Sequence, residues 1–108
     1  MRIVNLEEFE KLPSGTVYSK YEDCVFYGFM LKGETYEYDF TYADLIGNVE
    51  CNDSDDYSIK CELMKKGASL PTEIIYERDG LFIKEQLFAV YEREDIDRLI
   101  KALKEVEG

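Results

Sequence analysis

The last quarter of the chain changes from the pattern of a strand to the pattern of a helix. Gln86–Tyr91 is an almost wholly apolar run, which is typical of a strand buried on both faces. Aliphatic residues then recur on one helical face, and they predict an amphipathic helix with a narrow apolar stripe. The stripe consists of Ile96, Leu99, Ile100, Leu103 and Val106. Because such a helix needs an apolar surface to cover, we expect the rest of the chain to supply a sheet on which it packs.

This packing has an energetic consequence that depends on three residues of the stripe. If Leu99, Ile100 and Leu103 are buried against a sheet, truncating any one of them to alanine should cost roughly 2–5 kcal/mol of stability. The docked C-terminal helix is therefore an expectation that a structure or a mutant can contradict.

Three strands are predicted in the first half of the chain. Thr16–Tyr21 and Cys24–Leu31 are rich in β-branched and aromatic residues, and Gly28 indicates a bulge or a close approach by another backbone. In Tyr36–Tyr42, aromatic residues alternate with acidic residues and a threonine, which is the pattern of a half-buried strand. With a tight turn expected at Lys32–Glu34, the three strands form an antiparallel meander.

The second half of the chain adds a predicted hairpin. Thr72–Arg78 has a strand pattern and is followed by Asp79-Gly80, a pair favoured in two-residue type I′ turns. Leu81–Lys84 would then return along the first strand, either as a separate strand or continuous with Gln86–Tyr91. Residues 43–52 remain ambiguous between a helical turn and the end of a strand.

Two further helices have recognisable start and stop signals. Asn5 is an N-cap with Glu8 three residues later, the spacing of a capping box, and a proline ends this short helix. A second helix is expected between a cap at Asp53 or Ser54 and a C-terminal glycine, Gly67. Together the elements predict a single α+β domain over residues 1–108. Its sheet should be largely antiparallel, and its element order about α-βββ-α-βββ-α.

The chain is strongly acidic. Its 108 residues are enough for one domain with its own core, and they carry 24 acidic against 13 basic side chains, a net charge of −11, and no histidine. This charge repels nucleic acid backbones and anionic membranes and favours basic partners. We expect binding neither to duplex nucleic acid nor to membranes, although solubility alone would also account for the charge.

The cysteines indicate a reducing compartment. Cys24, Cys51 and Cys61 are an odd number without C-x-x-C spacing, whereas secreted disulfide frameworks normally have an even number. We therefore expect reduced, mostly buried thiols in a cytoplasmic protein. The N-terminus lacks the pattern of a signal peptide, and no apolar run reaches membrane-spanning length.

Patterns for catalysis and cofactor binding are missing from the sequence. Without histidine there is no Ser-His-Asp or Cys-His set, and no glycine-rich phosphate loop is present. Asp53-x-Asp55 resembles the start of a calcium loop. Tyr57, Ser58 and Met64 then depart from the EF-hand pattern at its fifth, sixth and twelfth positions, and a helix cap explains the aspartates better. We expect a non-enzymatic protein without a cofactor or a metal ion.

One segment of the chain carries charge of a single sign. Between Glu34 and Asp56 there are eight acidic residues and neither lysine nor arginine. They are Glu34, Glu37, Asp39, Asp44, Glu50, Asp53, Asp55 and Asp56. A solvated strand face and loop would account for them, but such a negative surface would also fit a basic groove on a protein partner. The eight residues are the candidate partner-binding site.

Both ends of the chain resemble a group of small uncharacterised proteins encoded in bacteriophage and prophage genomes. The resemblance lies in Leu6–Phe9 with Leu12–Ser19, and in Arg78–Phe82 with Gln86–Glu92. These motifs are structural, so no catalytic or binding residues come with them. The resemblance implies a setting, because small phage proteins often act on host machinery, including antiviral defence, by binding rather than by catalysis.

The sequence therefore predicts an inhibitor or adaptor that binds and modulates a host protein through its acidic segment. The alternative is an oligomeric protein that sequesters a nucleotide. In that case tyrosines would stack on the base, and a lysine or arginine of a neighbouring subunit would meet the phosphate. Nine tyrosines and six phenylalanines exceed the needs of a small core. We therefore expect several rings at the surface, and a homo-oligomer.

Overall fold

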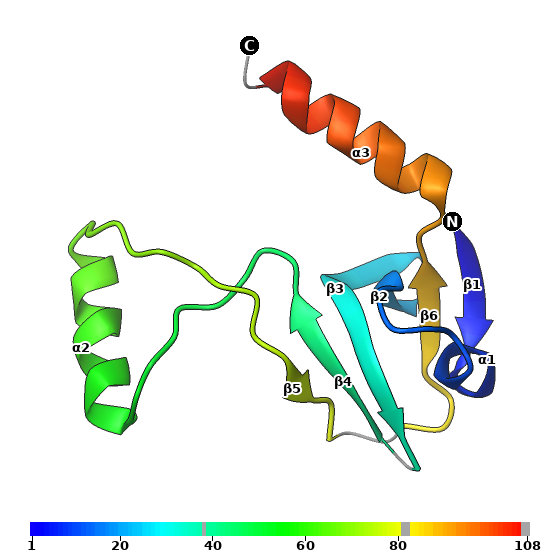
Figure 1. The fold of residues 1–108 in the computed structure, drawn as a ribbon, viewed down its shortest axis with the longest axis horizontal. Coiled ribbons are helices and arrows are strands. Elements are labelled where there is room, and N and C mark those ends of the chain that lie inside the picture. The colour runs from blue at the N-terminus through cyan, green and yellow to red at the C-terminus, as the bar shows by residue number, and fades with distance from the viewer. Residues whose placement is uncertain (38, 81–82, 107–108) are drawn as a thin grey trace.

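A six-stranded antiparallel sheet forms the centre of the computed structural model, which describes residues 1–37, 39–80 and 83–106 (Figure 1). The strands lie in the order β1-β6-β2-β3-β4-β5. They are β1 (Arg2–Asn5), β2 (Val17–Glu22), β3 (Val25–Tyr36), β4 (Asp39–Asp44), β5 (Glu77–Arg78) and β6 (Leu87–Val90). The helices are α1 (Leu6–Glu10), α2 (Ser54–Lys65) and α3 (Arg93–Val106).

The predicted α+β class with an antiparallel sheet is confirmed. The order of the described elements is β-α-βββ-α-ββ-α, which differs from the predicted order at both ends of the sheet. A first strand that the sequence pattern did not predict, β1, pairs along its whole length with β6. The apolar run that opens the C-terminal quarter is thereby enclosed between β1 and β2, as expected for a buried strand.

The core lies between α1 and one face of the sheet, which we call the covered face. Phe9 of α1 is fully buried, and its ring stacks on Phe88 with 4.0 Å between centroids. The same ring meets Tyr18 and Phe40 edge-on at 4.6 and 5.1 Å. Aromatic pairs in these geometries add to the stabilisation gained from burial. The cluster is completed by Val4, Leu6, Met30 and Val90.

The short helix α1 is held by its cap and by the core. The side chain of Asn5 accepts the Glu8 N–H at 2.9 Å, and the Glu8 carboxylate accepts the Asn5 N–H at 3.4 Å. This confirms the predicted capping box. Five residues are too few for a helix to persist alone, so its stability depends on burying Leu6 and Phe9.

Three other local signals are also confirmed. Gly28 has a φ of +76° and lies where the pairing of β2 with β3 shifts register, which is the bulge that its position indicated. Asp53, and not Ser54, caps α2, since its side chain accepts the Asp56 N–H. Gly67 ends α2, with its N–H bonded to the Met64 carbonyl at 3.0 Å.

The turn predicted at Lys32–Glu34 is wrong, because these residues continue β3. Lys32 is buried, and its ammonium donates to the Leu12 carbonyl at 2.9 Å and to the Thr35 hydroxyl at 2.5 Å. Gly33 leaves room for a ring, since a Cβ there would lie 3.1 Å from Tyr76. Contacts with distant parts of the chain thus keep Lys32–Glu34, whose sequence favours a turn, in a strand. The chain reverses only between Tyr36, the end of β3, and the start of β4.

Of the hairpin predicted around Asp79-Gly80, the structure describes the first strand, which is shorter than predicted, and part of the return. β5 contains only Glu77–Arg78 and pairs with β4, while Lys84 is not in a strand and Leu81–Phe82 lie outside the described residues. The Asp79 N–H donates to the Phe40 carbonyl at 2.9 Å. The turn residue Asp79 is therefore bound to β4.

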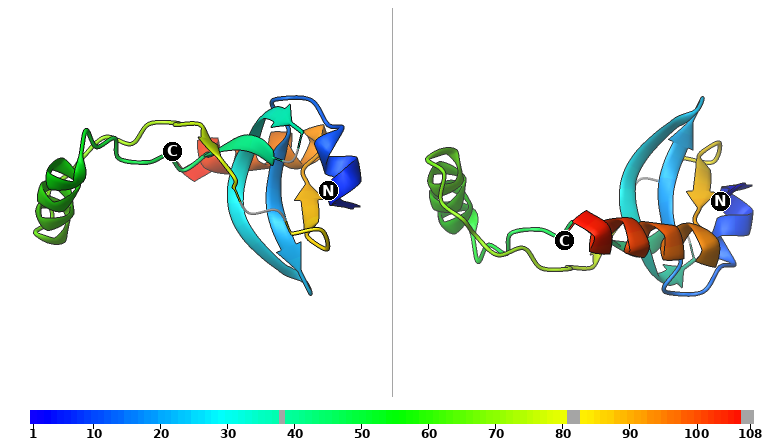
Figure 2. Two further views of the ribbon diagram at one scale, coloured as in Figure 1. Left: turned by 90° about the horizontal axis from the view of Figure 1, so that it is seen from below. Right: turned by 90° about the horizontal axis from the view of Figure 1, so that it is seen from above.

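α3 does not pack along the sheet, and this part of the prediction is wrong. None of its described residues is buried, and the exposed fractions are 37%, 45% and 58% at Leu99, Ile100 and Leu103. The helix leaves β6 and projects away on the side of the sheet opposite α1 (Figures 1 and 2). Its direction is fixed at the first turn, where the amino group of Met1 lies 2.5 Å from the Asp95 carboxylate. The expected cost of truncating the stripe therefore does not apply to one protomer.

The chain is extended for its length. Its radius of gyration is 16.1 Å and its principal extents are 42 × 40 × 25 Å, whereas a compact chain of this length has a radius of gyration of about 13 Å. α2 and α3 cause the difference, since both stand away from the sheet (Figure 1).

Candidate functional site

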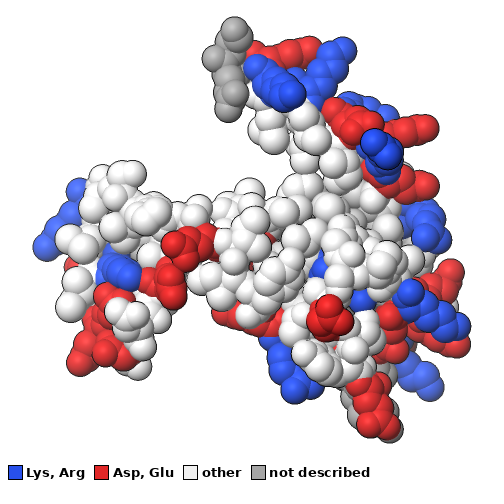
Figure 3. Space-filling model, viewed as in Figure 1, with Lys and Arg blue, Asp and Glu red and all other residues white. Residues whose placement is uncertain are grey.

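The structure divides the eight candidate acidic residues between separate regions. Three lie at the β3–β4 hairpin, namely Glu34, Glu37 and Asp39. Four gather at the N-terminal end of α2, namely Glu50, Asp53, Asp55 and Asp56. Asp44 ends β4 at its far end from the hairpin. In Figure 3, one group of acidic side chains lies at the lower end of α2, and another group lies separately around the sheet. The eight do not form one strand face.

Asp39 at the hairpin is occupied by contacts within the protein. Its carboxylate lies 3.0 Å from the Arg78 guanidinium and accepts the Gly80 N–H at 3.1 Å. Partial burial works against ionisation, but two backbone N–H groups and the guanidinium of Arg78 outweigh it and hold the pKa of Asp39 below its ordinary value. Asp39 thus ties β4 to the residues after β5, and its charge is already balanced.

Two of the acids at α2 also have structural roles. Asp53 accepts the Asp56 N–H at 2.7 Å as the helix cap. Asp56 accepts the Asn52 N–H at 2.9 Å and pairs with Lys60 at 3.1 Å, and these two contacts lower its pKa. Lys60 also donates to the Glu50 carbonyl. Among the described residues, no ion pair or side-chain hydrogen bond engages the carboxylates of Glu50 or Asp55, and both residues are exposed.

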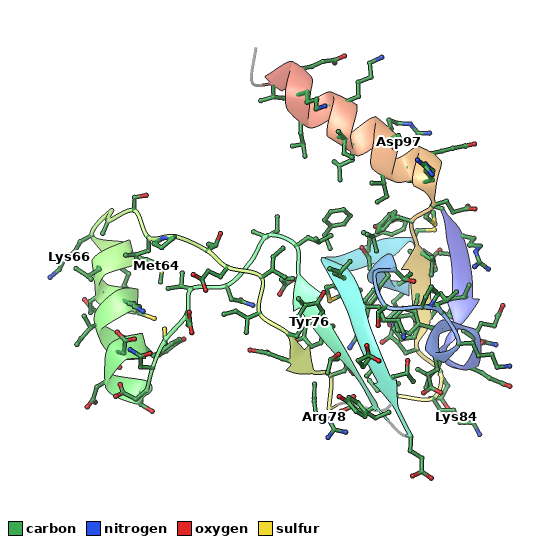
Figure 4. The ribbon with its side chains drawn as sticks, in the orientation of Figure 1. Met64, Lys66, Tyr76, Arg78, Lys84 and Asp97 are labelled. Carbon is green, nitrogen blue, oxygen red and sulfur yellow. The ribbon has the colours of Figure 1, made fainter. Side chains whose placement is uncertain are left out.

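Residues 45–76, which we call the α2 lobe, form a unit away from the core. Two tethers join α2 to the sheet, and the backbones of Asn48 and Glu73 exchange two 2.8 Å hydrogen bonds between them. None of the described α2 residues is buried. Its exposed apolar side chains are Tyr57, Ile59, Leu63 and Met64. Figure 4 shows Met64 and Lys66 on opposite sides of the end of α2, with Lys66 directed away from the sheet.

Further rings and aliphatic side chains are exposed where the α2 lobe meets the sheet. Ile46, Ile74 and Tyr76 lie on the two tethers or at their ends, and all three are exposed. Tyr76 lies beside β4 in Figure 4. The expectation that several rings lie at the surface is confirmed, since Phe26, Tyr27 and Tyr36 are exposed as well. The α2 lobe therefore presents exposed apolar side chains together with the carboxylates of Glu50 and Asp55, which are unpaired among the described residues.

The three cysteines and the buried Lys32 are spread over the β2–β3 turn, the α2 lobe and β3. Cys24 is exposed, and Cys51 and Cys61 are half-buried, so the expectation of mostly buried thiols is wrong. Cys24 occupies the β2–β3 turn, which needs a positive φ and places its side chain in solvent. Burial lowers the pKa of the Lys32 ammonium, but this group donates to the Leu12 carbonyl just after α1 and to the Gly33 carbonyl in β3. Within residues 1–37, 39–80 and 83–106, no cluster of acidic or cysteine side chains is placed to hold a metal ion.

A cavity of about 270 Å³ lies at the base of α3. Its walls include Phe29 and Tyr91, whose rings meet edge-on at 5.5 Å, and Leu99 of the helix. Arg98 also lines it and lies 3.7 Å from Asp95. The cavity therefore combines two aromatic rings with one basic group that is partly balanced.

Comparisons with known proteins give no relative for this chain: no protein-family model, curated protein or solved structure matches it. None of the described helices combines the length and the apolar character needed to cross a membrane.

Proposed function

We propose that the protein is a non-enzymatic inhibitor or adaptor that binds a partner protein through the α2 lobe. One observation carries the proposal: α2 stands away from the core with none of its described residues buried, and it places exposed carboxylates beside exposed apolar side chains. Because none of its described residues is buried, α2 adds little to the hydrophobic core of the protein itself. A partner surface would bury it.

The two kinds of side chain on the α2 lobe would have different roles in binding. Glu50 and Asp55 would steer a basic partner into contact, because complementary charge mainly raises the association rate. Tyr57 and Leu63 would provide the buried contact, since aromatic and large apolar side chains at the centre of an interface account for most of the binding energy. Asp39 contributes less, because its charge is already balanced by Arg78.

The partner is expected in a bacterial cytoplasm. The resemblance to phage-encoded proteins suggests a host component, which includes antiviral defence proteins, and the net charge of −11 favours one with a basic surface. The lack of a catalytic residue set in the sequence supports binding rather than a reaction.

Binding kinetics with charge-matched variants would test the proposal. A host protein captured on the immobilised chain would be measured against the double variant Glu50→Gln/Asp55→Asn and against Tyr57→Ala. We expect the double variant to slow association and to weaken its salt dependence, and Tyr57→Ala to speed dissociation. The matched control is Glu7→Gln/Glu85→Gln, which removes two exposed charges outside the α2 lobe.

The proposal fails if the control and the α2-lobe variants bind alike, or if affinity ignores salt. Asp53 and Asp56 are left unchanged, because their loss would damage the helix and would mimic loss of a binding residue.

Nucleotide sequestration is the second candidate, and the cavity at the base of α3 favours it. Two aromatic rings and Arg98 line this cavity, and a base could stack on such rings. The nearby Asp95 and the overall charge oppose an anionic ligand. A thermal-shift screen with cyclic and linear nucleotides separates the two candidates. A stabilisation that Arg98→Gln abolishes would support sequestration by an oligomer over the inhibitor.

A further inference from the structure

Among the described helices, only the base of α3 meets the sheet face opposite α1 (Figure 2). We call this face the open face. The strand register places Ile3 beside Ala89, and Tyr21 beside both Leu87 and Phe26, on this face. The exposed fractions of Ile3, Leu87 and Phe26 are 40%, 38% and 46%. An exposed apolar patch on a sheet marks a surface that another element covers.

The open face is also free of charge over its central strands. Paired residues of an antiparallel sheet share a face, so the register assigns to it the alternate residues of β1, β6, β2 and β3. They are Ile3, Asn5, Leu87, Ala89, Val17, Ser19, Tyr21, Phe26 and Leu31. None of them is acidic or basic, in a chain where 34% of residues are charged.

α3 presents the second uncovered apolar surface. Exposure of its stripe rises along the helix, from 37% at Leu99 to 58% at Leu103 and 84% at Val106. Only the base of the helix meets the open face, where Leu99 lines the cavity beside Phe29 and Tyr91. Beyond the base, α3 extends away from the sheet on the side of the open face (Figure 2).

We propose that a second copy of this chain covers both surfaces, with α3 of each protomer packed on the open face of the other across a two-fold axis. A two-fold interface must be self-complementary, and each chain supplies one amphipathic helix and one partly exposed sheet face, on which Ser19 and Ala89 are already buried. When each protomer packs its α3 on the open face of the other, one kind of contact, formed twice, buries both surfaces. It also restores helix-on-sheet packing, which the apolar stripe predicts and which one protomer does not achieve.

The charge distribution favours this occupant. The chain carries −11, so most surfaces of two copies repel each other. α3 is an exception, because its four basic residues match its four acidic residues. These residues are Arg93, Arg98, Lys101 and Lys104 against Glu94, Asp95, Asp97 and Glu105. The uncharged open face and the neutral α3 are thus the surfaces on which a second copy meets the least repulsion.

The mass of the full chain in solution tests the proposal, with matched glutamine variants of α3. We expect light scattering to give twice the 12.6 kDa chain mass. Leu99→Gln/Leu103→Gln should raise the dimer dissociation constant at least about tenfold, the effect of losing a central interface contact. Lys101→Gln/Lys104→Gln, on the polar side of the same helix, should leave it near the parent value. Circular dichroism would verify that all variants fold.

Cysteine cross-linking identifies the surface that α3 meets. Cys24, Cys51 and Cys61 would be replaced by serine, with Leu103→Cys in one tagged chain and Ile3→Cys in another. Mild oxidation of the mixture should join the two tags. A monomeric parent, or a dimer indifferent to the Leu99→Gln/Leu103→Gln change, would overturn the proposal. So would a bond only between two Leu103→Cys chains, or a bond within one chain that carries both changes.

Discussion

α1 and α3 are both amphipathic helices, yet their apolar faces have opposite environments. α1 has five residues and buries Phe9 completely, whereas α3 has 14 residues and buries none of those described. The difference does not follow from hydrophobicity or length, since the longer helix has the longer stripe. It follows from the connections: α1 is placed over the covered face by β1 and β2, while α3 leaves the end of β6 and points outward. Amphipathicity thus indicates that a helix covers something, without indicating what.

The substitution with the largest expected effect on stability lies at the centre of the core. Phe9→Ala should destabilise the protein by about 3–5 kcal/mol, because it removes a buried ring and leaves a cavity among Tyr18, Phe40 and Phe88. Urea unfolding followed by circular dichroism would measure the change. A loss below about 1 kcal/mol, the usual size for a surface substitution or a minor packing change, would mean that the covered face is not the core.

The next largest effect concerns the sheet beside the α2 lobe. Gly33→Ala should cost roughly 1–3 kcal/mol, because the added Cβ would crowd the Tyr76 ring and the Thr41 hydroxyl. Gly67→Ala is a useful contrast, because an added Cβ there meets no neighbouring atom. Any cost at Gly67 would come from its backbone φ of +90° and not from crowding. If Thr41→Ala fails to recover part of the loss in the Gly33→Ala background, crowding is not the cause.

A stabilising change is expected within the core. The Tyr18 hydroxyl is buried without a described hydrogen-bond partner, and burial raises the pKa of Tyr18 well above its ordinary range. Tyr18→Phe removes this unsatisfied group and should raise the unfolding free energy by about 1 kcal/mol. Tyr57→Phe on exposed α2 is the control and should change little. Destabilisation by Tyr18→Phe would show that the hydroxyl has a partner.

Lowering the pH should reduce the stability of the sheet edge by a smaller amount. The ion pair between Asp39 and Arg78 is partly exposed, and solvent screens it. The pKa of Asp39 is lowered in the folded state, so its contribution is complete above the ordinary value of 3.8 and is lost as pH falls through the folded value. Unfolding measured from about pH 5 to about pH 3 should therefore show a shallower loss for Asp39→Asn than for the parent.

The smallest effect is expected in α3 of the dilute monomer. Leu103→Ala should change the unfolding free energy by less than about 0.5 kcal/mol, the range of exposed substitutions. The same variant should become clearly destabilised at concentrations where the dimer forms, since binding then contributes to stability. A concentration-independent loss of 2 kcal/mol or more, roughly the cost of truncating a buried leucine, would show that α3 packs on its own sheet.

Local signals in the sequence predicted the structure well where a few neighbouring residues decide it. The capping box at Asn5, the cap at Asp53, the bulge at Gly28 and the buried strand after Gln86 all depend on short-range chemistry. The prediction failed at Lys32–Glu34, because the Lys32 ammonium donates to the distant Leu12 carbonyl, which no local pattern reveals. For the same reason β1 was missed, since its partner β6 lies about 85 residues later in the chain.

For the candidate site as well, the sequence predicted local features but not those that depend on distant contacts. The single sign of charge between Glu34 and Asp56 is evident from the sequence, but its division between the hairpin and α2 is not. Asp39 looked equivalent to Glu50 and Asp55, yet hydrogen bonds assign it to structure, as they do the predicted cap Asp53. The exposure of the apolar side chains of α2 could not be predicted either, since a sequence pattern does not show whether a helix is docked.

The sequence by itself determined the α+β class, the helix boundaries near their caps, the apolar run of β6 and the acidic character of the chain. These follow from side-chain chemistry over a few residues, which is the same in every context. The tertiary structure alone decided which sheet face α1 covers, that Lys32 is buried, and that α2 and α3 leave the sheet with their apolar side chains exposed. Those outcomes depend on contacts between residues far apart in the chain and on the directions in which strands end, and neither is encoded in periodicity.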